Sequence, residues 1–180
     1  MCATFCRSRF ALLVLLVAAG ASCFAGSHPR LVYGAAELAA LRKDPQRVSE
    51  AAQAAAPYLS KARTASWSGY SIPLPAAPMP ARHPSTNWPY WTALGAELRM
   101  ELDALAYGYA MTGERGLFER ARTIMLGIAR WERWTDVDSC SNGKDPCLDT
   151  YLITFGMSIA YDYLYPHLSG DDRRTISNAI

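Results

Sequence analysis

The sequence predicts an all-α protein built of antiparallel helical hairpins. Alanine is abundant, and the alternation of apolar and polar residues that marks strands is nearly absent. Apolar residues recur instead at helical spacing. Short turn-forming sequences separate the apolar stretches, and such short connections force neighbouring helices to run antiparallel. The length of 180 residues is that of about one domain.

Residues 1–25 are typical of a secretory signal peptide. Arg7 and Arg9 precede an uncharged apolar run over 10–19, and small residues follow it. A run of about 10 residues is too short for a membrane anchor, which needs roughly 20. We therefore expect cleavage after Ala21 or Ala25.

Gly20-Ala21-Ser22-Cys23 offers an alternative, because it loosely resembles a lipobox. Gly20 stands where a large aliphatic residue is usual, so a lipid anchor at Cys23 is the less favoured interpretation. Both interpretations predict a secreted or periplasmic protein.

The charge balance excludes two classes of partner. The chain has 18 basic and 16 acidic residues, a formal net charge of +2. The leader carries Arg7 and Arg9 and no acid, so the mature chain is balanced at sixteen of each. Neither value is large enough to indicate nucleic acid or an anionic membrane as a partner, and we expect no nucleic-acid partner.

Two cysteines remain once the leader with Cys2, Cys6 and Cys23 is removed. Cys140 and Cys147 flank a stretch rich in turn formers, which can bring their sulfurs together. In an exported protein this pattern predicts a disulfide. A metal site would need further ligands close by, and no other His or Cys is near.

The first half of the mature chain is predicted to hold two helices and a long irregular segment. The helices span about 35–43 and 45–65. Residues 66–91 are too rich in proline for a regular helix or a central strand, so we expect an extended or wrapping segment there. Its prolines are Pro73, Pro75, Pro78, Pro80, Pro84 and Pro89.

A helical hairpin follows from Thr92. Apolar residues recur at helical spacing up to Thr112, and Gly113 suits the left-handed position that ends a helix. A second helix is expected from Glu114, and the short connection predicts an αα-hairpin.

Residues 148–165 are almost uniformly apolar or small, with Asp149 and Asp162 the charged exceptions. Such a helix is expected to be buried on all sides within a larger helical assembly. Its acids and tyrosines argue against a membrane span. Ser169, with acids behind it, predicts another helix that runs to Ile180, as if the chain were the front part of a longer protein.

Three blocks of sequence resemble one family, the heparinase II/III-like and oligo-alginate lyase-like proteins. The first is His28-Pro29-Arg30-Leu31-Val32-Tyr33 with the residues 36–42 that follow. The second covers 105–113, and the third runs from Leu148 to Tyr165. Within them, residues 106–109 (Ala-Tyr-Gly-Tyr) recur as 160–163 (Ala-Tyr-Asp-Tyr), which is the kind of echo a helical repeat produces.

The resemblance implies an incomplete (α/α) toroid of helical hairpins, followed in longer relatives by a β-rich region. Its parts would be a leader (1–25), N-terminal helices with a wrapping segment (26–91) and the first toroid hairpins (92–180). The family cleaves acidic polysaccharides by β-elimination without a cofactor. The resemblance assigns the catalytic Asn or Glu, His and Tyr to positions beyond Ile180, so this chain would supply scaffold.

The proline-rich segment holds the candidate substrate-binding residues. Cations and amides suit an anionic sugar, and indole rings suit stacking on it. The alternative is a wrapping segment whose aromatic rings pin it to the helices. The candidates are Arg82, His83, Asn87, Trp88 and Trp91.

Other candidates have structural interpretations that we favour. We expect a structural role for His28 and a solvated loop position for His167. For Arg99 we favour a pair with Asp103 on a solvated face over the alternative that it points to the substrate groove. Trp131 and Trp134 could line a sugar subsite, although packing at a helix end is favoured. Asp162, on the apolar helix, is expected to cap or bond a neighbouring helix rather than to catalyse.

Two further functions stay open. No nucleophile elbow, phosphate loop, dinucleotide fingerprint or HExxH motif occurs. Paired carboxylates of an (α/α)-barrel glycoside hydrolase are compatible with the acids present. A non-catalytic helical module that binds carbohydrate is equally compatible.

Overall fold

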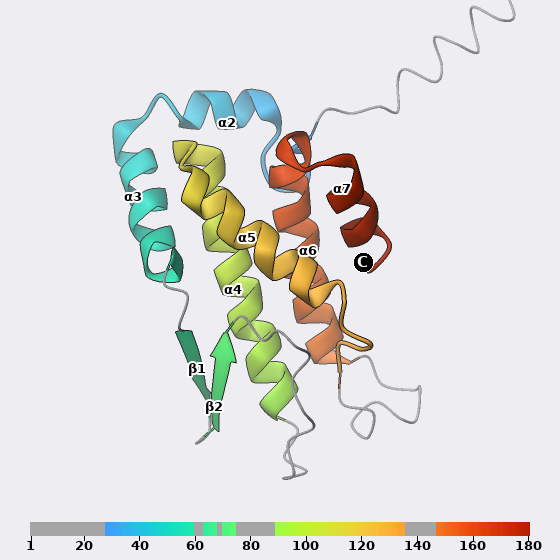
Figure 1. Ribbon diagram of the computed structural model, residues 1–180. Coiled ribbons are helices and arrows are strands. Elements are labelled where there is room, and N and C mark those ends of the chain that lie inside the picture. Colours follow the sequence, from blue (N-terminus) through green and yellow to red (C-terminus); the bar gives the residue numbers. More distant parts are fainter. Residues whose placement is uncertain (1–27, 60–62, 68–69, 75–88, 136–146) are drawn as a thin grey trace, which may run out of the picture.

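The computed structural model describes residues 28–59, 63–67, 70–74, 89–135 and 147–180 (Figure 1). This part of the chain is mostly helical, as predicted. Its α-helices are α2 (Ala35–Leu41), α3 (Pro45–Ala55), α4 (Pro89–Thr112), α5 (Arg115–Ile128), α6 (Leu148–Leu164) and α7 (Gly170–Ser177). Two short 3₁₀ turns, η1 (Ala56–Leu59) and η2 (Tyr165–His167), and two strands, β1 (Arg63–Trp67) and β2 (Tyr70–Leu74), complete it.

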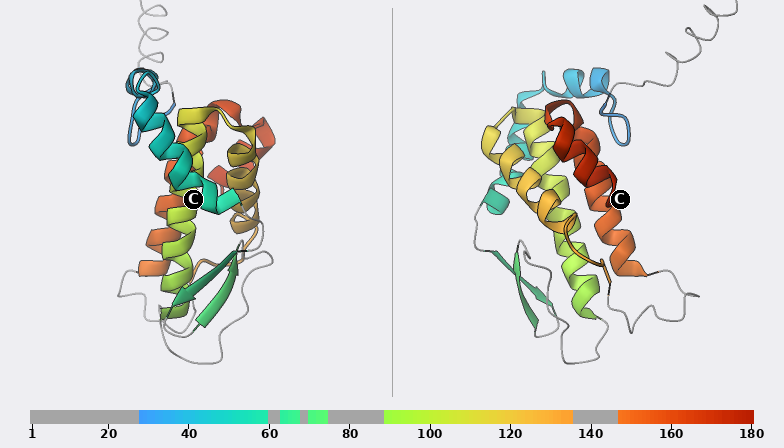
Figure 2. Two further views of the ribbon diagram at one scale, coloured as in Figure 1. Left: turned by 90° about the vertical axis from the view of Figure 1, so that its left-hand side faces the viewer. Right: turned by 45° about the vertical axis from the view of Figure 1, so that its right-hand side comes forward.

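Helix α4 is the centre of the fold. It packs most extensively against α6 and also contacts α3 and α5 (Figures 1 and 2). The connection between α4 and α5 is the predicted hairpin. Gly113 takes the left-handed conformation with a φ of 73°, and its N–H bonds the carbonyl of Tyr109 at 2.8 Å.

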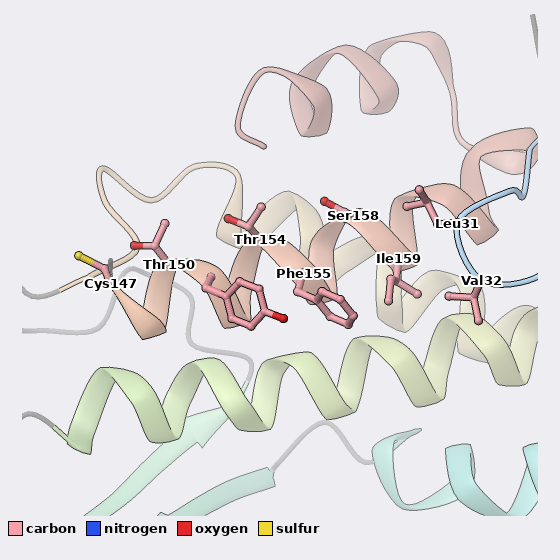
Figure 3. A pocket seen from close by; sticks show the side chains of 9 residues that line it. Leu31, Val32, Cys147, Thr150, Thr154, Phe155, Ser158 and Ile159 are labelled. Atoms are coloured by element: carbon pink, nitrogen blue, oxygen red, sulfur yellow. The ribbon is translucent and has the colours of Figure 1, made fainter. Parts of the chain in front are cut away.

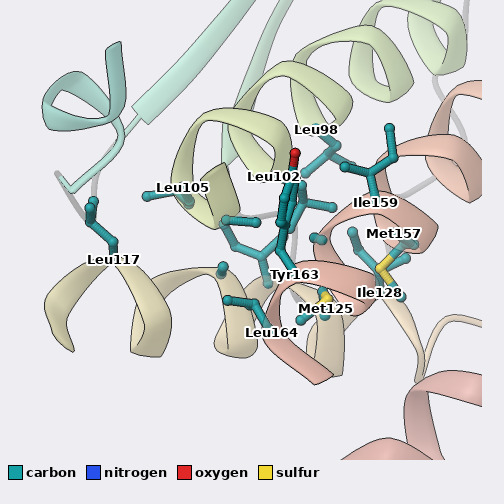
Figure 4. Close-up of a cluster of buried hydrophobic side chains, with 14 of the residues drawn as sticks. Leu98, Leu102, Leu105, Leu117, Met125, Ile128, Met157, Ile159, Tyr163 and Leu164 are labelled. Carbon is teal, nitrogen blue, oxygen red and sulfur yellow. The ribbon is translucent and has the colours of Figure 1, made fainter. Parts of the chain in front are cut away.

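The core lies where α4, α5 and α6 meet (Figure 4). Its side chains lie at the helical spacing seen in the sequence, and each fully buried one contributes about 1.5–3 kcal/mol of transfer free energy. The largest include Leu98, Leu102 and Leu105 of α4, Leu117, Met125 and Ile128 of α5, and Ile153 and Met157 of α6.

Glycines let two helix pairs approach closely. A Cβ at Gly108 of α4 would lie 2.6 Å from the Cβ of Ala55 at the end of α3. A Cβ at Gly156 of α6 would lie 2.8 Å from the Cα of Arg99 on α4. The absence of a side chain at these two positions therefore sets how closely α3 and α6 pack against α4.

The predicted helix over 45–65 is wrong in its second half. Helix α3 ends at Ala55 because Pro57 lacks the N–H that a further turn would need. The chain then forms β1 and β2, an antiparallel pair in which Trp67 faces Tyr70. Pro73 is accommodated because each strand of a two-stranded sheet has a free edge.

Several boundaries refine the prediction. Helix α4 begins at Pro89 rather than Thr92, with proline in its first turn where no N–H is needed. Ser169 caps α7 as expected, its hydroxyl accepting from the N–H of Asp172 at 3.1 Å. Helix α7 ends at Ser177, so the expectation that it runs through Ile180 is wrong. Among the described helices, none has the length and apolar character that a membrane span requires.

Candidate functional site

Asp162 on α6 binds residues 28–34, which precede α2 and which we call the N-terminal segment. Its carboxylate is buried and accepts hydrogen bonds from the backbone N–H groups of Arg30 at 2.6 Å and Leu31 at 2.7 Å. It also accepts one from Nδ1 of His28, which must therefore carry the proton. The imidazole in turn stacks on Tyr165, with ring centroids 4.0 Å apart. His28 and Asp162 thus meet in one structural contact. The expectation that Asp162 caps or bonds a neighbouring helix is wrong in its partner, because His28, Arg30 and Leu31 precede the helix that begins at Ala35.

The pKa of Asp162 reflects this contact. Burial by itself raises the pKa of the carboxyl. The hydrogen bonds from Arg30, Leu31 and His28 outweigh burial, so the pKa lies below its ordinary value. The group is therefore a stable anion that holds the segment in place.

Beside this contact lies a cleft of about 630 Å³ between the N-terminal segment, α3, α4 and α6. We call it the tyrosine cleft, after Tyr33, Tyr107 and Tyr163 in its wall. The Tyr107 ring lies 6.0 Å from that of Tyr33 and 6.0 Å from that of Tyr163, measured between centroids. Its remaining lining is Val32, Arg47, Glu50, Ala51, Ala54, Arg99, Asp103, Ala104, Phe155 and Ile159.

Four polar groups of the tyrosine cleft have no hydrogen-bond partner among the described residues. Within the described part of the chain, no hydrogen bond forms to the hydroxyls of Tyr33, Tyr107 or Tyr163 or to the carboxyl of Asp103. Tyr163 is only 6% exposed, and burial, followed by the neighbouring tyrosines and acids, raises the pKa of its hydroxyl. Burial also raises the pKa of Asp103, which the charge of Arg99 partly offsets.

Arg99 and Asp103 do not form the expected salt bridge, although both are described in full. The Arg99 guanidinium lies over the ring of Phe155 instead, 4.5 Å from its centroid. Both side chains are half-buried and line the cleft, so the prediction of a solvated pair is wrong. The close contact of Gly156 with the Arg99 backbone brings α6 near enough for this stacking.

An apolar groove of about 690 Å³ continues from the tyrosine cleft along α6 (Figure 3). Leu31 and Val32 contribute one end of it and are about half exposed. Leu148 and Tyr151 of α6 are also about half exposed. Helix α6 is therefore open on one face, and the expectation that it is buried on all sides is wrong.

Only one of the candidate substrate-binding residues lies in the described part of the chain. Trp91 is 3% exposed and meets Trp131 edge to face, with ring centroids 6.3 Å apart. Its ring is thus packed inside the fold, where no sugar could stack on it. Arg82, His83, Asn87 and Trp88 lie outside the described residues, as do Cys140 and the leader.

The remaining predictions can be placed briefly. Trp131 is buried, and the indole N–H of Trp134 donates to the carbonyl of Ile128 at 3.2 Å, which is helix-end packing. His167 is exposed, and its ring lies edge-on to Tyr109. Cys147 is disulfide-bonded, and its pairing with Cys140 stays a prediction.

Charged pairs that the sequence analysis missed sit inside the bundle. Glu101 is fully buried and pairs with Arg120 at 3.2 Å. Arg122 pairs with Asp172 through two hydrogen bonds of 2.8 and 2.9 Å, which hold the pKa of that carboxyl below its usual value. Both pairs join a residue of α5 to a neighbouring helix, so they fix the packing of α5.

No cluster of three or more His, Cys, Asp or Glu that could hold a metal occurs among the described residues. The sequence matches none of the known protein-family models, and no curated protein is detectably similar to it. The interpretation of function therefore rests on the residues themselves and on the three blocks named above.

Sequence reasoning did not find the tyrosine cleft. One signal was present, because Tyr33, Tyr107 and Tyr163 come one from each of the three blocks. The pattern of each block indicated only that its residues pack within the fold. Nothing in the patterns indicated that the three tyrosine rings would lie side by side. Only the pairing of α4 with α6, and the contact of the N-terminal segment with Asp162, bring them together.

Proposed function

We propose that this chain is the N-terminal helical scaffold of an exported polysaccharide lyase that cleaves uronate-containing polysaccharide by β-elimination. Its helices would be the first hairpins of an (α/α) toroid. The leader at 1–25 would direct it to the periplasm or the outside of the cell, with an anchor at Cys23 as the alternative.

The observation that carries the proposal is the convergence of the three lyase-like blocks on one place. The first block reaches the third through the contacts of His28, Arg30 and Leu31 with Asp162. The second reaches the third where Tyr107 meets Tyr163. A scaffold of this family is expected to pack these blocks against one another, and the contacts agree with that expectation.

In such a lyase a base removes the proton at C5 of the uronate, the C4–C5 double bond forms, and the glycosidic oxygen leaves with a proton. Neutralising the carboxylate stabilises the enolate-like transition state. The resemblance places none of the residues for these steps within this chain. Its contribution would be a rigid wall against which the reacting part of the protein is built.

The test is product chemistry. The complete gene product that carries this segment is incubated with alginate, heparan sulfate and hyaluronan, and ultraviolet absorbance of the unsaturated uronate is followed. Absorbance that grows with time supports the lyase. New reducing ends without absorbance would replace it by a glycoside hydrolase.

A second function is favoured by the tyrosine cleft itself. Its hydroxyls, which have no partner among the described residues, suit a carbohydrate-binding module without catalysis of its own. Glycan binding by the complete product, with neither absorbance nor new reducing ends on any of these polymers, would favour the module over both enzymes.

A further inference from the structure

We propose that the tyrosine cleft is a binding site for one pyranose ring, held by the hydroxyls of Tyr107 and Tyr163 and by the side chains of Arg99 and Asp103. This rests on the second of the proposed functions, the carbohydrate-binding module, and deepens it by naming the kind of ligand and the residues that hold it; it does not require a lyase.

The size and form of the cleft suit a small ligand. Its volume of about 630 Å³ lies within the usual range for small-molecule sites, about 300–1,000 Å³. Four separate parts of the chain enclose it: the N-terminal segment, α3, α4 and α6. Such sites combine apolar walls with a few convergent polar groups, and Ile159 and Phe155 supply apolar wall here.

The polar groups match the chemistry of a sugar. A pyranose hydroxyl both donates and accepts, and a phenol hydroxyl can do the same for it. A guanidinium adds donors and a carboxylate adds acceptors, so Arg99 and Asp103, one turn apart on α4, together can bond neighbouring hydroxyls. The aromatic rings offer apolar faces to the C–H side of the sugar.

The hydroxyl of Tyr163 is open to water when the cleft holds no ligand. The residue as a whole is only 6% exposed, but its hydroxyl oxygen is not among the buried side-chain atoms that lack a hydrogen bond. A ligand hydroxyl can take the place of water at this position, with the phenol ring as the wall behind it.

The charges of the cleft favour a neutral ring as much as an acidic one. Arg47 and Arg99 are balanced by Glu50 and Asp103. Two probes therefore distinguish a neutral from an acidic ligand: methyl β-D-glucopyranoside and methyl β-D-glucuronide. Sorbitol, which has the hydroxyls without the ring, is the control ligand.

The experiment is a ligand titration of the full chain followed by NMR. We expect saturable binding of one or both glycosides with a Kd on the order of 1–10 mM, as suits a ligand this small, and none of sorbitol. Tyr163→Phe and Tyr107→Phe should each weaken binding about 5- to 10-fold, since each removes one hydrogen bond.

Tyr109→Phe is the matched control. Tyr109 lies on the same helix as Tyr107 and is half-buried, but it packs against Phe118 and His167 away from the cleft. Its substitution should leave the Kd unchanged. Unfolding of each variant in urea shows that it has kept its fold.

Two results would overturn the site: no saturable binding of either glycoside, or binding that Tyr109→Phe weakens as much as Tyr163→Phe does. Neither bears on product absorbance from the complete protein, so the site and the lyase can fail separately. Tighter binding of the glucuronide would indicate that its carboxylate binds Arg99. Equal binding of the two glycosides would indicate that Arg99 binds ring hydroxyls. Both results support the site.

Discussion

Substitution of Asp162 by asparagine should release the N-terminal segment from α6. The carboxylate accepts three hydrogen bonds, from the backbone of Arg30 and Leu31 and from His28. Hydrogen bonds to a charged group are worth about 1.5–3 kcal/mol each. The asparagine side chain would have one accepting oxygen in place of two and no charge. Its NH₂ group would face at least one of the three groups that now donate to the carboxylate. We expect the free energy of unfolding to fall by about 2–4 kcal/mol.

Two measurements check this on the full chain. Urea unfolding gives the loss of stability, and limited trypsin digestion reports the segment itself, since Arg30 is exposed and trypsin cleaves after it. Cleavage there should speed up in Asp162→Asn. Asp171→Asn is the matched control, because Asp171 is exposed and its salt bridge is with exposed Arg174; it should change stability by less than about 0.5 kcal/mol.

The effect should also depend on pH. The pKa of Asp162 is lower in the folded than in the unfolded chain, so unfolding takes up a proton in acid. The stabilisation is fully present above the unfolded pKa, about 3.9, and is lost as the pH falls through the folded pKa. Unchanged stability and unchanged cleavage after Arg30 at neutral pH would refute the role assigned to this carboxylate.

Three further outcomes follow from the packing. Arg120→Met should cost about 3–5 kcal/mol in urea unfolding, because Glu101 stays buried while its ion pair with Arg120 is lost; adding Glu101→Gln should recover part of the loss, and no recovery would contradict the pair. Gly108→Ala should lower the free energy of unfolding by about 1–3 kcal/mol, and with it the midpoint of thermal unfolding, since the new Cβ would meet Ala55; an unchanged midpoint would mean that α3 moves aside without cost. Tyr163→Phe should leave stability unchanged or raise it by up to about 1 kcal/mol, and a loss of about 2 kcal/mol or more would show that the hydroxyl has a partner.

Local signals in the sequence predicted the helices well. The positive φ of Gly113 and the cap of Ser169 depend on a few neighbouring residues, so their patterns could be read directly. The hairpin of β1 and β2 was missed because its strands are short and one contains Pro73, which counted against a strand. A two-stranded edge tolerates what a central strand does not.

The candidate site depended on contacts that no local pattern contains. Asp162 was expected to cap or bond a neighbouring helix, but its partners belong to the segment before the first described helix, more than a hundred positions earlier in the chain. Arg99 and Asp103 had the spacing of a surface pair, and only the position of Phe155 on α6 shows why the guanidinium turns away. The spacing of residues along one helix predicts which of them share a face of that helix. A cleft depends on how several helices are placed relative to one another, which that spacing does not contain.

The tie between the N-terminal segment and Asp162 also sets an order in time. His28 and Asp162 are 134 positions apart. At a synthesis rate of about 5–20 residues per second, the segment is made roughly 7–27 seconds before its partner. During that interval nothing on α6 can hold it. Residues 28–31 are therefore among the last parts of the described chain to dock.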